Sequence, residues 1–365
     1  MSPKDIAPAR PHVLRSVAHR RAAFAVLAAA SALTVSACGA APTGTINTRA
    51  GYSVTSEDIP VSVCPTEGES RFTGDEGLLV GAHFALRVEC VASFDEIPEG
   101  FQLDYLFGEG TDLYPPEPGY EFTLVQFAPE PGVTAPYTPE SPEELSATLA
   151  IGDRTWNFDG EVPAPGAVYF AVAKKDSPIT LEVADVERSQ AMDLRERTRE
   201  GLVQALYTGK LEVDTEPVSG SVDGYTTEGS YEYWFDDWKY STKFIATREV
   251  FRPGEGWVAE PDRAVLGLEF GWLLSGSGLE WGIDLEDALK VTGPDGALTP
   301  LTADHVDEDL GDGVWRTFTL TYDVPADALA FTLDFHPKGP VKWPEEDISI
   351  PITGDQNHEI PVSFE

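Results

Sequence analysis

Apolar residues at every second position are the feature of this sequence that most constrains its fold. Alternation with a period of two is typical of antiparallel β-strands that bury one face and expose the other. Between the alternating segments lie loops rich in proline, glycine and aspartate, which do not fit central strands. The clearest alternating sets are Phe84/Leu86/Val88/Cys90, Phe101/Leu103/Tyr105/Phe107, Val168/Phe170/Val172, Ile179/Leu181/Val183, Phe318/Leu320/Tyr322 and Leu329/Phe331/Leu333/Phe335.

We therefore expect a mainly β fold made of two tandem antiparallel β-sandwich domains. Helix is expected to be scarce: Asp284–Leu289 could supply one turn, and Leu202–Tyr207 could form a short helical turn or a strand. Threonine, proline, serine and glycine accumulate from Glu212 to Gly224, and we place the boundary between the domains there. The predicted first domain covers residues 51–215, and the predicted second domain, which is rich in tryptophan, covers residues 216–365.

The chain begins with a segment that has the properties of a secretory signal. Basic residues, among them Arg20 and Arg21, precede an apolar run from Ala22 to Val35 that is too short for a standard membrane-spanning helix. The run ends in Val-Ser-Ala-Cys at residues 35–38, which resembles the lipobox of bacterial lipoproteins. This resemblance implies cleavage before Cys38 and a diacylglyceryl thioether on that residue. The alternative is an ordinary cleaved signal in which Cys38 has no special role.

On the lipoprotein interpretation, residues 1–37 are the signal peptide, and residues 38–50 are the lipidated cysteine and a flexible tether. Acyl chains on Cys38 would anchor the protein to the extracytoplasmic face of the bacterial cell membrane, because each buried CH₂ contributes about 0.8 kcal/mol. The formal net charge of −37 argues against nucleic acid as a partner and repels anionic lipid headgroups. The acyl chains, and not the surface charge, would therefore hold the protein to the bilayer.

The chain has three cysteines. If Cys38 is acylated, Cys64 and Cys90 remain as a pair outside the cell, where disulfides persist. We therefore expect a Cys64–Cys90 disulfide, and the alternative is two buried free thiols. Two isolated cysteines without a nearby histidine pair do not indicate a metal site.

Two further parts of the sequence resemble secreted actinobacterial lipoproteins of unassigned function. These parts are Ile179–Asp185 with the following Gln190–Leu194, and Tyr322–Asp327. The resemblance covers about half of the chain after the signal and includes no catalytic motif. It implies immunoglobulin-like sandwich domains, and such a fold by itself does not imply a function.

Catalytic and cofactor motifs are not found in the sequence. It contains no Gly-x-Ser-x-Gly and no His-Glu-x-x-His, and carboxylates are so numerous that a glycosidase-like pair is expected by chance. Four aspartates surround two glycines in a pattern that suggests a calcium loop, although the spacing departs from the EF-hand, and we prefer a solvated acidic turn. These aspartates are Asp304, Asp307, Asp309 and Asp312. We expect neither a cofactor nor a metal.

Aromatic residues are distributed unevenly, because seven of the eight tryptophans follow Trp156 in the second half. Many rings gather between Tyr225 and Tyr240, beside Asp236 and Asp237. Aromatic faces next to carboxylates can stack on sugar rings or anchor a protein partner, and the alternative is that these rings fill a sandwich core. The candidate ligand-binding residues are Tyr233, Trp234, Trp238 and Tyr240.

Two functions are consistent with these patterns. The first is a membrane-tethered, non-enzymatic binding or accessory module that presents a surface to another component of the cell envelope. The second is a carbohydrate-binding or carbohydrate-active envelope protein that uses carboxylates beside the tryptophans of the second domain. A binding module should show an exposed aromatic patch, whereas an enzyme should place two carboxylates in a concave aromatic pocket. We favour the first function because no catalytic constellation is found.

Overall fold

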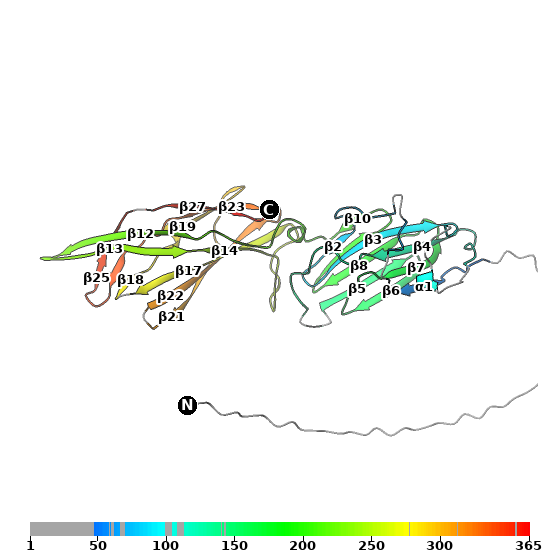
Figure 1. Ribbon diagram of the computed structural model, residues 1–365, viewed down its shortest axis with the longest axis horizontal. Helices are drawn as coiled ribbons and strands as arrows, with labels where there is room; N and C mark the ends of the chain where they lie inside the picture. The colour runs from blue at the N-terminus through cyan, green and yellow to red at the C-terminus, as the bar shows by residue number, and fades with distance from the viewer. Residues whose placement is uncertain are drawn as a thin grey trace, which may run out of the picture. The chain divides into compact units, whose positions relative to one another are not determined.

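The computed structural model describes residues 47–365, except for 58, 60–61, 66–69, 99–103, 108–112, 140, 142–143, 277, 312 and 355. The predicted signal peptide, the predicted lipidation site Cys38 and most of the predicted tether lie outside this part of the chain, as does Asp312. Within it the fold is mainly β with antiparallel sheets, as predicted (Figure 1). No helix among the described residues is long and apolar enough to span a membrane.

The first half of the structure contains two five-stranded sheets that pack face to face. One sheet has the order β1 (Ser53–Ser56), β7 (Val168–Lys174), β4 (Tyr120–Phe127), β3 (Ala85–Phe94) and β2 (Leu78–Val80). The other has the order β10 (Thr198–Glu200), β9 (Arg188–Asp193), β8 (Ile179–Asp185), β5 (Leu145–Ile151) and β6 (Arg154–Asp159). A shared hydrophobic core joins the two sheets through residues such as Val88, Leu149 and Leu181. This arrangement is a β-sandwich.

The sheet that contains β4 and β7 is buried on both faces. Val125, Phe127 and Tyr169 face the core that is shared with the other sheet. Their neighbours Phe122 and Phe170 face a second apolar cluster, in which the segment that carries Cys64 covers the sheet. Strands buried on both faces read as continuous apolar runs, and β7 is buried at every position from 168 to 173. The alternation that predicted β7 therefore does not mark an exposed face.

The second half of the structure is built mainly from three sheets around one hydrophobic core, to which Leu268, Phe318, Leu333 and Tyr240 belong. The largest sheet has the path β11 (Glu212–Asp214), β14 (Phe244–Glu249), β17 (Arg263–Gly276), β18 (Leu279–Trp281), β24 (Val341–Trp343) and β25 (Ile348–Ile350), and β22 (Gly313–Pro325) joins β17 to β21 (Thr302–Asp309). A four-stranded sheet has the order β20 (Gly296–Ala297), β19 (Leu289–Gly293), β23 (Ala330–Phe335) and β27 (His358–Ser363). A three-stranded sheet has the order β13 (Tyr231–Thr242), β12 (Val218–Glu228) and β26 (Ile352–Thr353).

The remaining elements are short. They are the two-stranded sheet of β15 (Phe251–Arg252) and β16 (Gly256–Trp257), and the helices α1 (Asp104–Phe107), η2 (Gln204–Leu206) and α2 (Leu285–Ala288). Helix α2 confirms the single turn expected after Asp284, whose side chain caps it by accepting a hydrogen bond from the Glu286 N–H. The strand expected over Phe101–Phe107 is wrong at Tyr105 and Phe107, because helix α1 occupies these positions, and Phe101 and Leu103 lie outside the described residues. Alternation over so few residues does not separate a strand from one helical turn.

Residues 46–365 group as one compact unit. Strand β11 pairs with β14, so Glu212–Asp214 already belongs to the largest sheet of the second half. The division of the chain into two domains at residue 215 stays a prediction.

Candidate functional site

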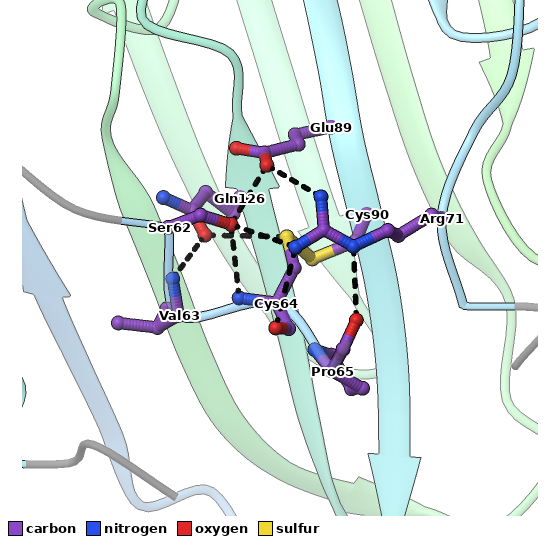
Figure 2. Close-up of a disulfide and its surroundings, with 8 residues drawn as sticks. All are labelled: Ser62, Val63, Cys64, Pro65, Arg71, Glu89, Cys90 and Gln126. Carbon is purple, nitrogen blue, oxygen red and sulfur yellow. Dashed lines mark hydrogen bonds and ion pairs between the residues drawn. A yellow bond between two sulfur atoms is a disulfide. The ribbon is translucent and has the colours of Figure 1, made fainter. Parts of the chain in front are cut away.

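The predicted disulfide is confirmed, and Figure 2 shows how it lies. Cys64 and Cys90 are bonded, with 5.9 Å between their Cα atoms. Cys90 lies on β3 and is fully buried, whereas Cys64 lies in the segment that covers the outer face of the sheet. Gln126 on β4 supports this segment, because its Oε1 accepts a hydrogen bond of 2.8 Å from the Val63 N–H. The disulfide therefore fixes a covering segment to the sheet.

Arg71 supports the same corner from the other side (Figure 2). Its Nη1 lies 2.9 Å from Glu89 Oε1, and its Nε donates a hydrogen bond of 2.9 Å to the Pro65 carbonyl. Ser62 Oγ donates to the same Glu89 oxygen at 2.7 Å. These contacts hold backbone and side chains in place, so the corner is a structural device.

The four aromatic residues predicted to bind a ligand do not share one environment. Trp234 is 61% exposed, whereas Tyr240 is only 7% exposed and belongs to the core. Tyr233 and Trp238 are half-buried and pack against the core, with Trp343 and Trp281 as ring neighbours. Tyr240 is therefore a core residue. Trp234 is the one of the four candidates that is exposed enough to contact a ligand.

Tyr240 is held by polar partners inside the second half. Its hydroxyl lies 2.6 Å from His358 Nε2, and it donates a second hydrogen bond of 3.2 Å to Gln356 Oε1. Burial raises the pKa of Tyr240. Burial also lowers the pKa of His358, and the neighbouring His336 lowers it further. This polar cluster joins β13 to β27 and is not open to a large ligand.

The exposed rings belong to the hairpin of β12 and β13, which extends past the ends of the neighbouring strands in Figure 1. Tyr225 on β12 lies directly opposite Trp234 on β13, so the two side chains share one face of the hairpin. Tyr225 is 51% exposed, and Tyr231 beside the turn is 69% exposed. We call Tyr225, Tyr231 and Trp234 the aromatic tip.

Tyr225 and Tyr231 were not among the four predicted candidates. The sequence does contain a signal for them, because Gly229-Ser230 between two aromatic segments is a two-residue hairpin turn. Residues next to such a turn lie at the end of a hairpin, where core side chains are out of reach. The turn could therefore have pointed to exposed rings at Tyr225 and Tyr231.

Carboxylates surround the aromatic tip. Burial and the neighbouring Glu232 raise the pKa of Tyr225. Burial raises the pKa of Tyr233, and Glu346 and Glu228 raise it further. Tyr231 adds a smaller contribution to the raised pKa of Tyr233, and the other charged neighbours in both cases are carboxylates. The surroundings of these rings are therefore negative.

A β-bulge separates the aromatic tip from the core part of the hairpin. Val222 pairs with Trp238 and Gly224 pairs with Phe235, so β13 holds one extra residue there. Asp237 adopts a left-handed conformation with φ 54°, and its N–H donates a hydrogen bond of 2.7 Å to Asp223 Oδ1. The bulge places Trp238 on the inner face with Phe235, while Trp234 faces outward.

Carboxylates and a tryptophan meet at a different place, in a cavity of about 490 Å³. Its lining includes Glu144, Glu187, Glu255, Arg188 and Trp257. The Arg188 guanidinium stacks on the Trp257 ring at 4.7 Å from its centre, and burial lowers the pKa of Arg188. Arg188 Nη1 is buried and has no hydrogen-bond partner among the residues that the structure describes. Carboxylates and guanidinium groups are what hydroxyl-rich ligands bind.

Three of the four aspartates of the suggested calcium loop, Asp304, Asp307 and Asp309, lie on strand β21. The side chain of Asp307 pairs with Arg316 through two bonds of 2.6 and 2.7 Å, which lower the pKa of Asp307. Asp309 accepts a hydrogen bond of 2.8 Å from the Gly311 N–H. Asp304 lies on the opposite face of the strand from Asp307, and the described part of the chain holds no cluster of three or more metal-binding side chains.

Two further histidines, His83 and His305, lie in contrasting surroundings. His83 Nδ1 lies 2.6 Å from Asp185 Oδ1, and both side chains are buried. The His83 N–H also donates a hydrogen bond of 3.1 Å to Asp185 Oδ2, so this pair ties the turn before β3 to the end of β8. His305 is exposed on β21.

The chain was compared with protein-family models, curated proteins and solved structures. No protein-family model, no curated protein and no solved structure matches the chain.

Proposed function

We propose that this protein is a membrane-tethered extracytoplasmic lipoprotein that acts as a non-enzymatic binding or accessory module and docks a protein partner through its aromatic tip. The observation that carries this proposal is the exposure of Tyr225, Tyr231 and Trp234 together on one protruding hairpin. Large aromatic side chains are the residues that most often anchor protein interfaces. The tether on Cys38 would keep this surface close to the membrane.

The exposed area of the aromatic tip limits the binding free energy that it can contribute. Three such side chains, exposed by 51% to 69%, offer roughly 350 Å² of aromatic surface, which corresponds to about 9 kcal/mol if it is fully covered. Association itself costs about 4–15 kcal/mol in lost freedom of motion. The aromatic tip is therefore sufficient for the centre of an interface but needs further contacts for stable binding.

The test is cross-linking of the tethered protein on intact cells, with identification of the captured molecules. The test variant is Tyr225→Thr/Tyr231→Thr/Trp234→Thr, because threonine keeps a high strand propensity and removes the rings. We expect wild type to capture a reproducible protein partner and the variant to lose it, since loss of one anchor of about 2 kcal/mol weakens binding about 30-fold.

A matched control replaces two exposed apolar residues away from the hairpin, in Leu301→Thr/Val306→Thr. These residues are 61% and 73% exposed, so the control removes exposed apolar atoms at a place outside the hairpin, over a smaller area than the triple variant does. Equal capture by wild type and the triple variant, or capture of glycan alone, would overturn the proposal.

A carbohydrate-binding function is the second candidate, and the cavity at Trp257 favours it. A sugar hydroxyl can accept a hydrogen bond from Arg188 and donate one to Glu144, Glu187 or Glu255, which line the same cavity. The test is a glycan-binding screen with wild type and Arg188→Met. Binding that disappears in the variant would support this candidate, and a screen without binding would remove it.

A further inference from the structure

Strand β13 has a free edge at the aromatic tip. It forms one edge of its three-stranded sheet, and its only pairing among the described residues is with β12. The pairing of β12 with β26 is limited to Asp223 and Gly224, so the hairpin is two-stranded beyond that point. An unpaired strand edge exposes N–H and C=O groups that can pair with another chain.

The turn identifies which backbone groups face this edge. Glu228 pairs with Tyr231 across the two-residue Gly229-Ser230 turn, and Gly229 has φ 62°. In a hairpin with a two-residue loop, the residues that flank the loop form a hydrogen-bonded pair, and the next pair turns its backbone groups outward. Glu232 and Trp234 on β13 therefore direct their N–H and C=O groups to the free edge.

The bulge limits the length of this edge. Asp236 and Asp237 interrupt the regular pairing after Phe235, and the left-handed Asp237 breaks the extended conformation. A strand added along Tyr231–Phe235 would therefore end at the bulge. Natural edge strands use such bulges to restrict pairing.

The carboxylates beside the free edge of β13 favour an added strand with basic side chains. Five carboxylates lie between residues 223 and 239, where Lys239 is the one base, and Lys239 is itself paired with Asp237 at 3.5 Å. The acidic residues are Asp223, Glu228, Glu232, Asp236 and Asp237. Lysine or arginine on the added strand would meet these carboxylates and the face of Trp234, and both contacts favour a cation.

The same charges argue against two other occupants. A second copy of this chain that paired β13 with β13 would bring two equal sets of carboxylates together, and like charges opposite each other destabilise a sheet. An anionic lipid surface would be repelled for the same reason.

We propose that an extended, lysine- or arginine-bearing segment of a protein partner adds to β13 as a new strand along Tyr231–Phe235. This inference rests on the proposed function, because it names the partner class of the aromatic tip. The added backbone hydrogen bonds supply the further contacts that the aromatic tip needs, and the alternating side chains set the specificity.

The test measures binding of synthetic peptides to the full chain in detergent, by fluorescence anisotropy. The probes are a ten-residue peptide of alternating threonine and lysine and a peptide of equal length with glutamate in place of lysine. We expect the lysine peptide to bind, with an affinity that falls as salt rises, and the glutamate peptide to bind at least about tenfold more weakly.

Proline variants of the hairpin then separate strand addition from simple charge attraction. Glu232→Pro removes an N–H from the free edge, and Glu232→Thr removes the same carboxylate but keeps that N–H. Thr227→Pro is the matched control, because Thr227 lies opposite Glu232 and turns its N–H to the other edge of the hairpin. We expect Glu232→Pro to bind the lysine peptide at least about tenfold more weakly than both Glu232→Thr and Thr227→Pro.

The outcomes distinguish this inference from the proposed function. Failure of wild type to bind the lysine peptide, or equal binding by Glu232→Pro and Glu232→Thr, overturns strand addition. If the cellular partner is still captured by Glu232→Pro but lost by the variant without the aromatic tip, docking holds and strand addition fails. If the variant without the aromatic tip keeps its partner, the proposed function itself fails.

Discussion

Removal of the Cys64–Cys90 disulfide should lower the stability of the first half by an amount set by its loop length. The bond closes a sequence separation of 26 residues. In the chain-entropy description, a loop of this length restricts the unfolded chain by about 3.5 kcal/mol at 25 °C. For a sandwich of roughly 150 residues, this free energy corresponds to a fall in Tm of about 7–14 °C.

The assay is calorimetric unfolding of wild type, of wild type reduced while unfolded and then refolded, and of Cys64→Ala/Cys90→Ala. Reduction keeps both sulfur atoms, so it isolates the effect of the covalent bond. The double variant should be less stable than reduced wild type, because Cys90 is fully buried and alanine leaves unfilled volume there. A reduced protein that melts within about 1 °C of the oxidised protein would refute the loop-closure reasoning.

Three further predictions test other parts of the chain. Cys38→Ala should move the protein from the membrane fraction to the soluble fraction, and a variant that stays wholly in membranes would contradict lipid anchoring. The folded-state pKa of His358 is lowered, so its contribution to stability should be complete above the unfolded value of about 6.5 and be lost as pH falls through the folded pKa. His358→Asn should flatten the dependence of Tm on pH in this range, and an unchanged dependence would contradict the role of His358. Arg248 is 1% exposed and donates to the carbonyls of Thr208 and Ala326. Arg248→Met should lower the free energy of unfolding by about 2 kcal/mol in urea titrations, because the Thr208 carbonyl loses this donor and the Ala326 carbonyl keeps only its hydrogen bond from the Thr208 hydroxyl. An unchanged urea midpoint would contradict that role.

The strands themselves were largely predictable, because alternation is a local property of the sequence. Ile179–Asp185 forms β8 with buried and more exposed residues in turn, as its pattern indicates. The disulfide was predictable from cysteine number together with the lipobox resemblance. Local patterns also account for helix α2, whose capping aspartate precedes it directly in the chain.

Burial of β4 and β7 on both faces was not predictable from alternation. Their second face is covered by the segment that contains Val63 and Cys64, which lies far away in the sequence. Only the tertiary structure brings that segment onto the sheet. The position of α1 at Tyr105 and Phe107 was missed because the residue pattern there fits a strand and a helical turn equally well.

For the candidate binding surface too, the sequence determined some features and the tertiary structure determined others. The sequence determined that Tyr225–Tyr240 is aromatic and acidic. It did not determine which rings face outward, because Trp234 and Trp238 are four positions apart and would share one face of a regular strand. The bulge at Asp236 and Asp237 adds one residue and reverses the direction of every side chain that follows. Tertiary pairing with β12 therefore decided that Trp234 meets solvent while Trp238 and Tyr240 turn toward the core.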